Sequence, residues 1–255
     1  MKQKEEVSAE IKDAARPFTF GEGNKIGCLL IHGAFGGPED MRGLGEYLGE
    51  NNILAKGILL KGHGTKPSDL YDVKWNEWTA QVERELLNLR KACERVFLIG
   101  FSTGGLISLY TASEQEVDGV VTIGTPAYIK DRRLPLVLLL RFFKKEVRAP
   151  RGPDDPDLIP NPATYDRISL NAVSQVLGLT KEARRRAKKI SAPVLLIHAT
   201  GDSYSPPDSA RIFYETIRSS DKKILMINCP YHQLTMTKSK RRQVFEAVLD
   251  FIRSH

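Results

Sequence analysis

Short, continuous apolar runs alternate with helical patterns along most of this 255-residue chain. Each run has the length of one strand and is apolar at successive positions, as expected for a strand covered on both faces of a parallel sheet. The runs occupy residues 26–31, 53–60, 96–99, 119–124, 193–198 and 223–228, and helical patterns begin near residues 39, 76, 103, 207 and 238. Repeated strand–helix units of this kind predict an α/β fold, with a doubly wound, mostly parallel sheet and right-handed crossovers.

Residues 127–190 interrupt this alternation. We therefore expect a polar N-terminal extension at 1–15, a core formed by 16–126 and 191–255, and an inserted cap at 127–190. The insertion contains the apolar stretch Leu134–Phe143. Two interpretations are open for it: a cap helix that lines a pocket with its apolar face, or a lid that also contacts an anionic lipid surface.

The net charge of +7 raises the question of nucleic-acid binding. The insertion alone carries fifteen Lys and Arg against seven Asp and Glu, so the rest of the chain is close to neutral and no nucleic-acid partner is expected. The cluster Arg184–Arg186 is interpreted as the solvated face of a helix. The three cysteines, an odd number, argue against a secreted disulfide framework, and the sequence shows no apolar leader or membrane-spanning run, so we expect a cytoplasmic location.

The stretch Gly100–Gly104 has the pattern Gly-x-Ser-x-Gly, directly after one apolar run and before a helical pattern. This context is typical of a strand–turn–helix elbow that exposes a nucleophilic serine, here Ser102. Such a turn is so sharp that only small residues two positions on either side let the backbone pass, and Gly100 and Gly104 meet this requirement. Ligands in this architecture bind beyond the carboxyl ends of the strands, where Ser102 is expected to lie.

A serine hydroxyl needs a base to take its proton and an acid to orient that base. In the hydrolase order of serine, acid and histidine, the acid follows the next strand after the insertion and the histidine follows the last strand; Asp202 and His232 occupy these places. Asp208 is the alternative acid, although its position in the first turn of a helix already explains a carboxylate there. Three further histidines are set aside as structural or, at the end of the chain, as frayed: His63, His198 and His255.

The tetrahedral oxyanion of acyl transfer needs two backbone N–H donors. One comes from the residue after the nucleophile, Thr103, and the other from the turn after the strand that ends at Ile31. Ala34 is the expected second donor and Phe35 is the alternative, because the sequence does not set the register of this turn. If Ala34 donates, the Phe35 ring is free to line the acyl pocket.

Several motifs between about Pro17 and the C-terminus match a known family. They are Leu29–Gly33, Leu60–Thr65 with Trp75 and Trp78, Gly100–Gly105, Gly201–Asp202 with Pro207–Ala210, and Tyr231–Thr235. In these motifs the sequence resembles the bacterial carboxylesterase and monoacylglycerol lipase group of the α/β-hydrolase fold. The resemblance implies ester hydrolysis through Ser102, Asp202 and His232, with the oxyanion hole at Ala34 and Thr103.

The residues and the resemblance together predict a serine carboxylesterase that uses no metal and no cofactor. Its expected partner is a small, lipid-like ester with a short or medium acyl chain, monoacylglycerols included. Thioesters, lactones and hydroxycinnamoyl esters are alternatives, since each meets the same triad, whereas haloalkane or epoxide chemistry is disfavoured because the elbow carries Ser102 in place of a carboxylate. The alternative outside the enzymes is a ligand-binding protein of this fold that keeps the triad without turnover.

Overall fold

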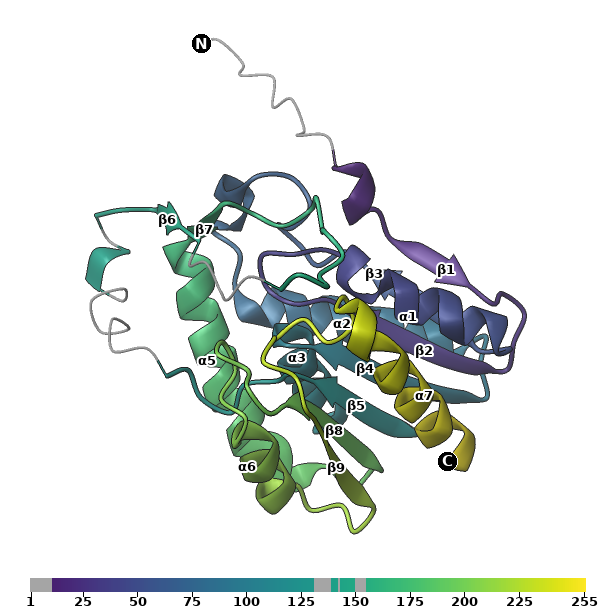
Figure 1. The fold of residues 1–255 in the computed structure, drawn as a ribbon. Helices are drawn as coiled ribbons and strands as arrows, with labels where there is room; N and C mark the ends of the chain where they lie inside the picture. Colours follow the sequence, from purple (N-terminus) through teal and green to yellow (C-terminus); the bar gives the residue numbers. More distant parts are fainter. Residues whose placement is uncertain (1–10, 131–138, 142, 150–154) are drawn as a thin grey trace.

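A central sheet organises the computed structural model, which describes residues 11–130, 139–141, 143–149 and 155–255. Within these ranges the sheet has seven strands in the order β1-β3-β2-β4-β5-β8-β9, and Figure 1 shows helices on both of its faces. Neighbouring strands pair in parallel except at the edge strand β1, which is antiparallel to β3. The bounds are β1 Phe18–Phe20, β2 Ile26–Ile31, β3 Leu54–Ile58, β4 Arg95–Phe101, β5 Gly119–Ile123, β8 Val194–Ala199 and β9 Lys222–Ile227.

Helices cover the two faces of the sheet because successive strand side chains point to opposite sides. Leu29 and Ile31 of β2 belong to one apolar cluster, and Cys28 and Leu30 belong to the other. The second cluster is covered by α1 (Glu39–Glu50) and α7 (Lys238–Ser254), and the first by α2 (Trp75–Arg90), α3 (Thr103–Ala112) and α6 (Ser209–Thr216). Short 3-10 turns lie at η1 Asp13–Ala15, η2 Pro67–Leu70 and η3 Ala187–Lys189.

The strand register brings the expected site residues to one edge of the sheet. Ile31 of β2 pairs with Gly100 of β4, and Phe101 of β4 pairs with Ile123 of β5. The chain therefore leaves these three parallel strands side by side, and β8 ends at the same edge before the loop that carries Asp202. This is the carboxyl edge, where open α/β sheets bind their ligands.

The inserted segment contributes a short antiparallel strand pair and a long helix. Strand β6 (Glu146–Arg148) pairs antiparallel with β7 (Arg167–Ser169), and α5 (Leu170–Arg186) follows directly and packs against α3. The Ser169 hydroxyl accepts the N–H of Ala172 at 3.2 Å and caps the start of α5. The predicted apolar helix at 134–143 lies mostly outside the described residues; of its described side chains, Leu139 and Phe143 are 59% and 83% exposed.

The prediction of an α/β fold with a mostly parallel sheet is confirmed, but three local features differ from expectation. Strand β1 is an antiparallel edge that the alternation did not indicate. The chain packs on the core before residue 16, since Ala15 is fully buried and the Lys12 N–H donates to the Gly64 carbonyl at 3.0 Å. The prediction that His255 is frayed is wrong: its ring lies 4.5 Å from that of Phe251.

Among the described residues, no helix combines the length and the apolar character that crossing a membrane requires.

Candidate active site

Ser102 occupies the sharp turn between β4 and α3. The strand ends at Phe101 and the helix begins at Thr103, so the whole turn is made at one residue, with φ 52° and ψ −115°. A non-glycine residue held in this region costs about 1–3 kcal/mol of strain. Two hydrogen bonds hold it there: the Ser102 N–H donates to Ile123 O at 2.8 Å, and the Thr125 hydroxyl donates to Ser102 O at 3.2 Å.

The glycines on either side of Ser102 leave no room for a side chain. A Cβ at Gly104 would lie 2.1 Å from the Ile31 carbonyl oxygen, and a Cβ at Gly100 would lie 2.2 Å from the Gly104 carbonyl carbon. Both contacts are with backbone, which cannot move aside as a flexible side chain can. The close approach of β4, α3 and β2 therefore requires glycine at both positions.

Asp202 and His232 are joined by a short hydrogen bond. The His232 Nδ1 lies 2.6 Å from Asp202 Oδ2, and the other carboxylate oxygen accepts the N–H groups of Tyr204 and Ser205 at 2.9 and 2.8 Å. Burial by itself raises the pKa of Asp202, but the bond from His232 and the other donors outweigh it, so the pKa lies below its ordinary value. An ionised Asp202 keeps the proton of His232 on Nδ1 and leaves Nε2 able to accept another.

The structure gives other roles to the alternative residues, His198 and Asp208. His198 is 1% exposed, and its Nε2 donates to the Ser205 carbonyl at 3.0 Å and lies 3.6 Å from Asp202 Oδ2. Its pKa is lowered, chiefly by burial, so it supports the Asp202 loop as a neutral ring. Asp208 precedes α6 and accepts the Tyr128 hydroxyl at 2.9 Å.

The turn after β2 is held by a buried histidine pair. His32 Nδ1–H donates to the Gly33 carbonyl at 2.7 Å, and its Nε2 accepts the Leu60 N–H at 3.0 Å. The His63 ring packs edge-on against His32 at 5.0 Å between ring centres. Burial lowers the pKa of His32 to about 3 and that of His63 to about 4, so both rings are neutral.

The hydrogen bond from His32 to the Gly33 carbonyl also sets the direction of the Ala34 N–H. The peptides of the described chain are trans, so the N–H of Ala34 points away from the Gly33 carbonyl across the same peptide plane. With that carbonyl held by His32, the Ala34 N–H faces the opposite side of the turn. Ala34 itself lines the cavity described next.

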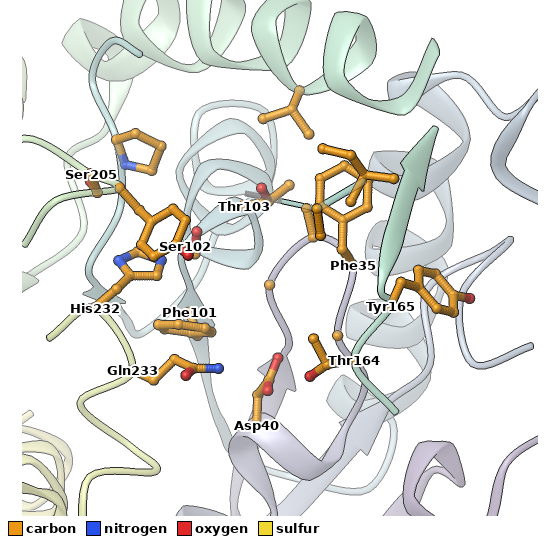
Figure 2. A pocket seen from close by; sticks show the side chains of 18 of the residues that line it. Phe35, Asp40, Phe101, Ser102, Thr103, Thr164, Tyr165, Ser205, His232 and Gln233 are labelled. Carbon is orange, nitrogen blue, oxygen red and sulfur yellow. The ribbon is translucent and has the colours of Figure 1, made fainter. Parts of the chain in front are cut away.

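A cavity of about 360 Å³ lies over the carboxyl edge of the sheet. In Figure 2 Ser102 lies between the His232 ring and the side chains of Thr103 and Phe35. Aliphatic side chains of the inserted segment form an apolar wall: Ile129, Ile168 and Val176. Asp40, Thr164 and Gln233 form a polar corner on the other side of Ser102 (Figure 2).

The family model Hydrolase_4, described as serine aminopeptidase, S33, matches residues 24–239. The chain belongs to this hydrolase family. It is 27% identical to the thermostable monoacylglycerol lipase of Bacillus sp. (strain H-257) over 249 residues, which cover 96% of this chain and 97% of that relative. It is 25% identical to a carboxylesterase of Bacillus subtilis (strain 168) over 238 residues, which cover 93% and 96% of the two chains.

A solved structure from the metagenome-derived lipolytic enzymes LipS and LipT has the same fold. It superposes with a TM-score of 0.90 at 24% identity and covers 96% of this chain and 100% of that one. The protein is thus an α/β-hydrolase of the group that contains carboxylesterases and monoacylglycerol lipases, as the motifs predicted.

The structure of this hydrolase brings all five predicted site residues to one edge of the sheet. Ser102, Thr103, Ala34 and His232 line the cavity, and Asp202 lies behind His232. Sequence reasoning missed Asp40, which lines the same cavity and is 3% exposed. A carboxylate in the first turn of a helix is ordinary, so the sequence held no signal that this one is buried.

Within the described ranges, no group of three or more His, Cys, Asp or Glu side chains is arranged to hold a metal ion. The three cysteines are buried and free.

Proposed function

We propose that this hydrolase is a carboxylesterase that cleaves esters of short to medium acyl chains, monoacylglycerols among them, through an acyl-enzyme on Ser102. The observation that carries the proposal is the bond between His232 and Asp202, 2.6 Å long, with His232 in the cavity wall that also exposes the strained Ser102 elbow. The names of the two Bacillus relatives support the ester and monoacylglycerol classes.

In the first half-reaction, Ser102 Oγ attacks the ester carbonyl carbon while His232 Nε2 takes the hydroxyl proton. The tetrahedral intermediate then collapses, the bond to the alcohol oxygen breaks, and His232 returns the proton to the leaving alcohol. Water repeats the sequence on the acyl-enzyme, and the acid is released as the proton goes back to Ser102. Asp202 stays ionised throughout and stabilises the positive charge that forms on His232.

The oxyanion is stabilised by the N–H groups of Thr103 and Ala34. Thr103 begins α3, so its N–H is one of the free donors at a helix N-terminus. We favour Ala34 over Phe35 as the second donor because the His32 bond to the Gly33 carbonyl turns the Ala34 N–H to the other side of the turn. The Phe35 ring then lines the part of the cavity that receives the acyl chain.

The cavity supports a substrate of modest size. Its volume of about 360 Å³ lies near the lower end of ligand pockets, and the wall under α5 and β7 is aliphatic. Leu139 and Phe143 are exposed beside Lys144 and Lys145, so this part of the inserted segment suits brief contact with an anionic lipid surface. Liposomes with and without anionic lipid, sedimented at low salt, test that contact: equal binding to both would remove it.

The nucleophile assignment is tested by covalent labelling. Wild-type protein should react with a fluorophosphonate at Ser102, mapped by mass spectrometry, and should release p-nitrophenol from short acyl esters. Ser102→Ala should do neither while keeping its thermal transition. Equal hydrolysis by both proteins would exclude Ser102, and an inactive, unlabelled wild type would favour the ligand-binding alternative. A panel of acyl lengths, thioesters, lactones and hydroxycinnamoyl esters then ranks the substrate classes.

A further inference from the structure

Asp40 is a buried carboxylate beside the nucleophile, and it takes no part in the proposed acyl-transfer steps. It lies in the first turn of α1, is 3% exposed and lines the cavity that holds Ser102 and His232. In Figure 2 it lies on the side of Ser102 where Thr164 and Gln233 are also found. A buried charge is costly unless it is hydrogen-bonded, so its partners indicate what it does.

The turn after β2 surrounds the Asp40 carboxylate. The Gly33 N–H lies close enough to lower the pKa of this carboxylate, and the Gly33 carbonyl accepts from His32. A Cβ added at Gly36 would lie 2.4 Å from Asp40 Oδ2, so the carboxylate lies inside the curve of the turn 33–37. The peptide group after Gly33, which carries the Ala34 N–H, is therefore held by His32, and the Asp40 carboxylate lies beside the rest of the turn.

The other partner comes from the inserted segment. Asn161 Nδ2 donates to Asp40 Oδ1 at 2.7 Å, and Asn161 Oδ1 accepts the Ala163 N–H at 2.8 Å. We call residues 161–165 the strap, because this segment lies along the turn. Ala163 is fully buried, and its Cβ would be 3.2 Å from a Cβ placed on Gly37.

The strap also fixes the far end of the turn. The Tyr165 N–H donates to the Phe35 carbonyl at 3.1 Å, and Phe35 has φ 61°, an uncommon conformation for an aromatic residue. Strain of this kind persists only where the surroundings over-determine it. The turn is thus held from the core by His32 and from the inserted segment by Asn161 and Tyr165, with Asp40 between the two.

The protonation of Asp40 fits such a role. Burial raises its pKa to about 6, and the hydrogen bond from Asn161 and the nearby Gly33 N–H oppose this rise. At neutral pH the group is therefore ionised and accepts the Asn161 amide in a charge-assisted bond, which is stronger than a neutral one.

We propose that Asp40 is a positioning residue: held by Asn161 of the strap, it fixes the turn 33–37 so that the Ala34 N–H faces the oxyanion. The proposal rests on the proposed function, because it needs an acyl-transfer reaction at Ser102. It makes the inserted segment part of the catalytic apparatus as well as the roof of the pocket.

Loss of the Asp40 contacts should lower kcat and leave KM little changed, because an oxyanion donor acts in the transition state and not on bound substrate. Removing one such donor costs about 10²–10³ in kcat, and Asp40 acts only through the donor. We therefore expect Asp40→Ala to lower kcat for p-nitrophenyl butyrate by about 10- to 100-fold, with KM changed by less than about threefold. Asp40→Asn, which keeps an oxygen to accept from Asn161, should recover most of the rate.

The link through the strap is tested by Asn161→Ala and the double variant. Asn161→Ala should also lower kcat, and Asp40→Ala with Asn161→Ala should be no slower than Asp40→Ala alone, since both act through one carboxylate. Asn171→Ala is the matched control. This second asparagine of the inserted segment donates to core carbonyls, those of Val73 at 3.2 Å and Leu70 at 3.5 Å, away from the turn.

Each outcome bears on the proposal. An unchanged kcat in Asp40→Ala, a change confined to KM, or an equal loss in Asn171→Ala would overturn it. If Asp40→Ala does not fold, judged by its thermal transition, Asn161→Ala compared with Asn171→Ala provides the test: equal kcat in the two variants would overturn the proposal. Failure of the proposed function looks different: the wild type itself would then be inactive and unlabelled by fluorophosphonate.

Discussion

Acid should destabilise this protein through the histidine pair that holds the turn after β2. His63 is 4% exposed, its Nδ1 lies 3.3 Å from the Lys61 carbonyl oxygen, and its ring contacts those of His32 and Trp78. Because burial lowers its pKa to about 4, the folded protein leaves it neutral at pH 5. The unfolded chain, in which a histidine has a pKa of about 6.5, binds a proton there.

Proton linkage sets whether the free energy of unfolding rises or falls with pH. Between pH 6.5 and pH 4 the unfolded state holds more protons than the folded state, so the free energy of unfolding falls as the pH falls. For a pKa of about 4 against about 6.5, the loss between pH 7 and pH 5 is about 2 kcal/mol. His32, with a pKa of about 3, adds a loss of about the same size. Asp40 offsets about 1 kcal/mol, since its raised pKa makes the folded state take up a proton over the same interval.

The assay is urea unfolding at pH 7 and pH 5, followed by circular dichroism. His63→Gln should be less stable than wild type at pH 7, yet its loss between the two pH values should be smaller by about 2 kcal/mol. Val82→Ala is the control, because it weakens the same apolar cluster from α2 without removing a titrating group. It should keep the wild-type pH dependence. If His63→Gln and wild type lose the same free energy, His63 is not the buried neutral ring described here.

Three further predictions concern the Ser102 elbow, Asp202 of the triad and the apolar wall of the cavity. Gly104→Ala places a Cβ 2.1 Å from the Ile31 carbonyl oxygen and should lower the free energy of unfolding by more than about 3 kcal/mol in urea, whereas Gly43→Ala, with 3.5 Å to its nearest neighbour, should be neutral or stabilising. Asp202→Asn should reduce kcat by about 10³–10⁴ with the fold intact, because the amide favours the wrong tautomer of His232; a loss below tenfold would argue against its role. Val176→Phe should shift the ratio of kcat/KM for hexanoyl over acetyl esters toward acetyl, and an unchanged ratio would place the acyl chain elsewhere.

Much of the fold could be predicted because its signals are local. The parallel strands are short, continuous apolar runs, and α1 begins at Glu39 as the pattern indicated. Strand β1 was missed because its three residues are too few to show a period. It is stabilised by tertiary packing, since the Phe18 ring fills the space beside Gly45 and Gly57. The antiparallel pair of β6 and β7 was missed for a related reason, since its two strands are short and distant in sequence.

The candidate site divides in the same way. Ser102 could be predicted because the elbow is a local motif, and Asp202 and His232 because they follow strands in a known order. Chain order favoured His232 over His198, but the contacts that separate the two rings are tertiary: His232 Nδ1 lies 2.6 Å from the carboxylate and His198 Nε2 lies 3.6 Å from it. That difference depends on how the loops after β8 and β9 pack.

By itself, the sequence determined the alternation of strands and helices, the elbow at Ser102 and the chain order of the triad candidates, because each depends on a local pattern or on the order of elements along the chain. Only the tertiary structure decided that His32 turns the Ala34 N–H and that Asp40 meets Asn161, 121 positions away. The physical reason is burial. A carboxylate or an imidazole acquires its charge state and its partners from the elements that exclude water around it, and those elements come from distant parts of the chain.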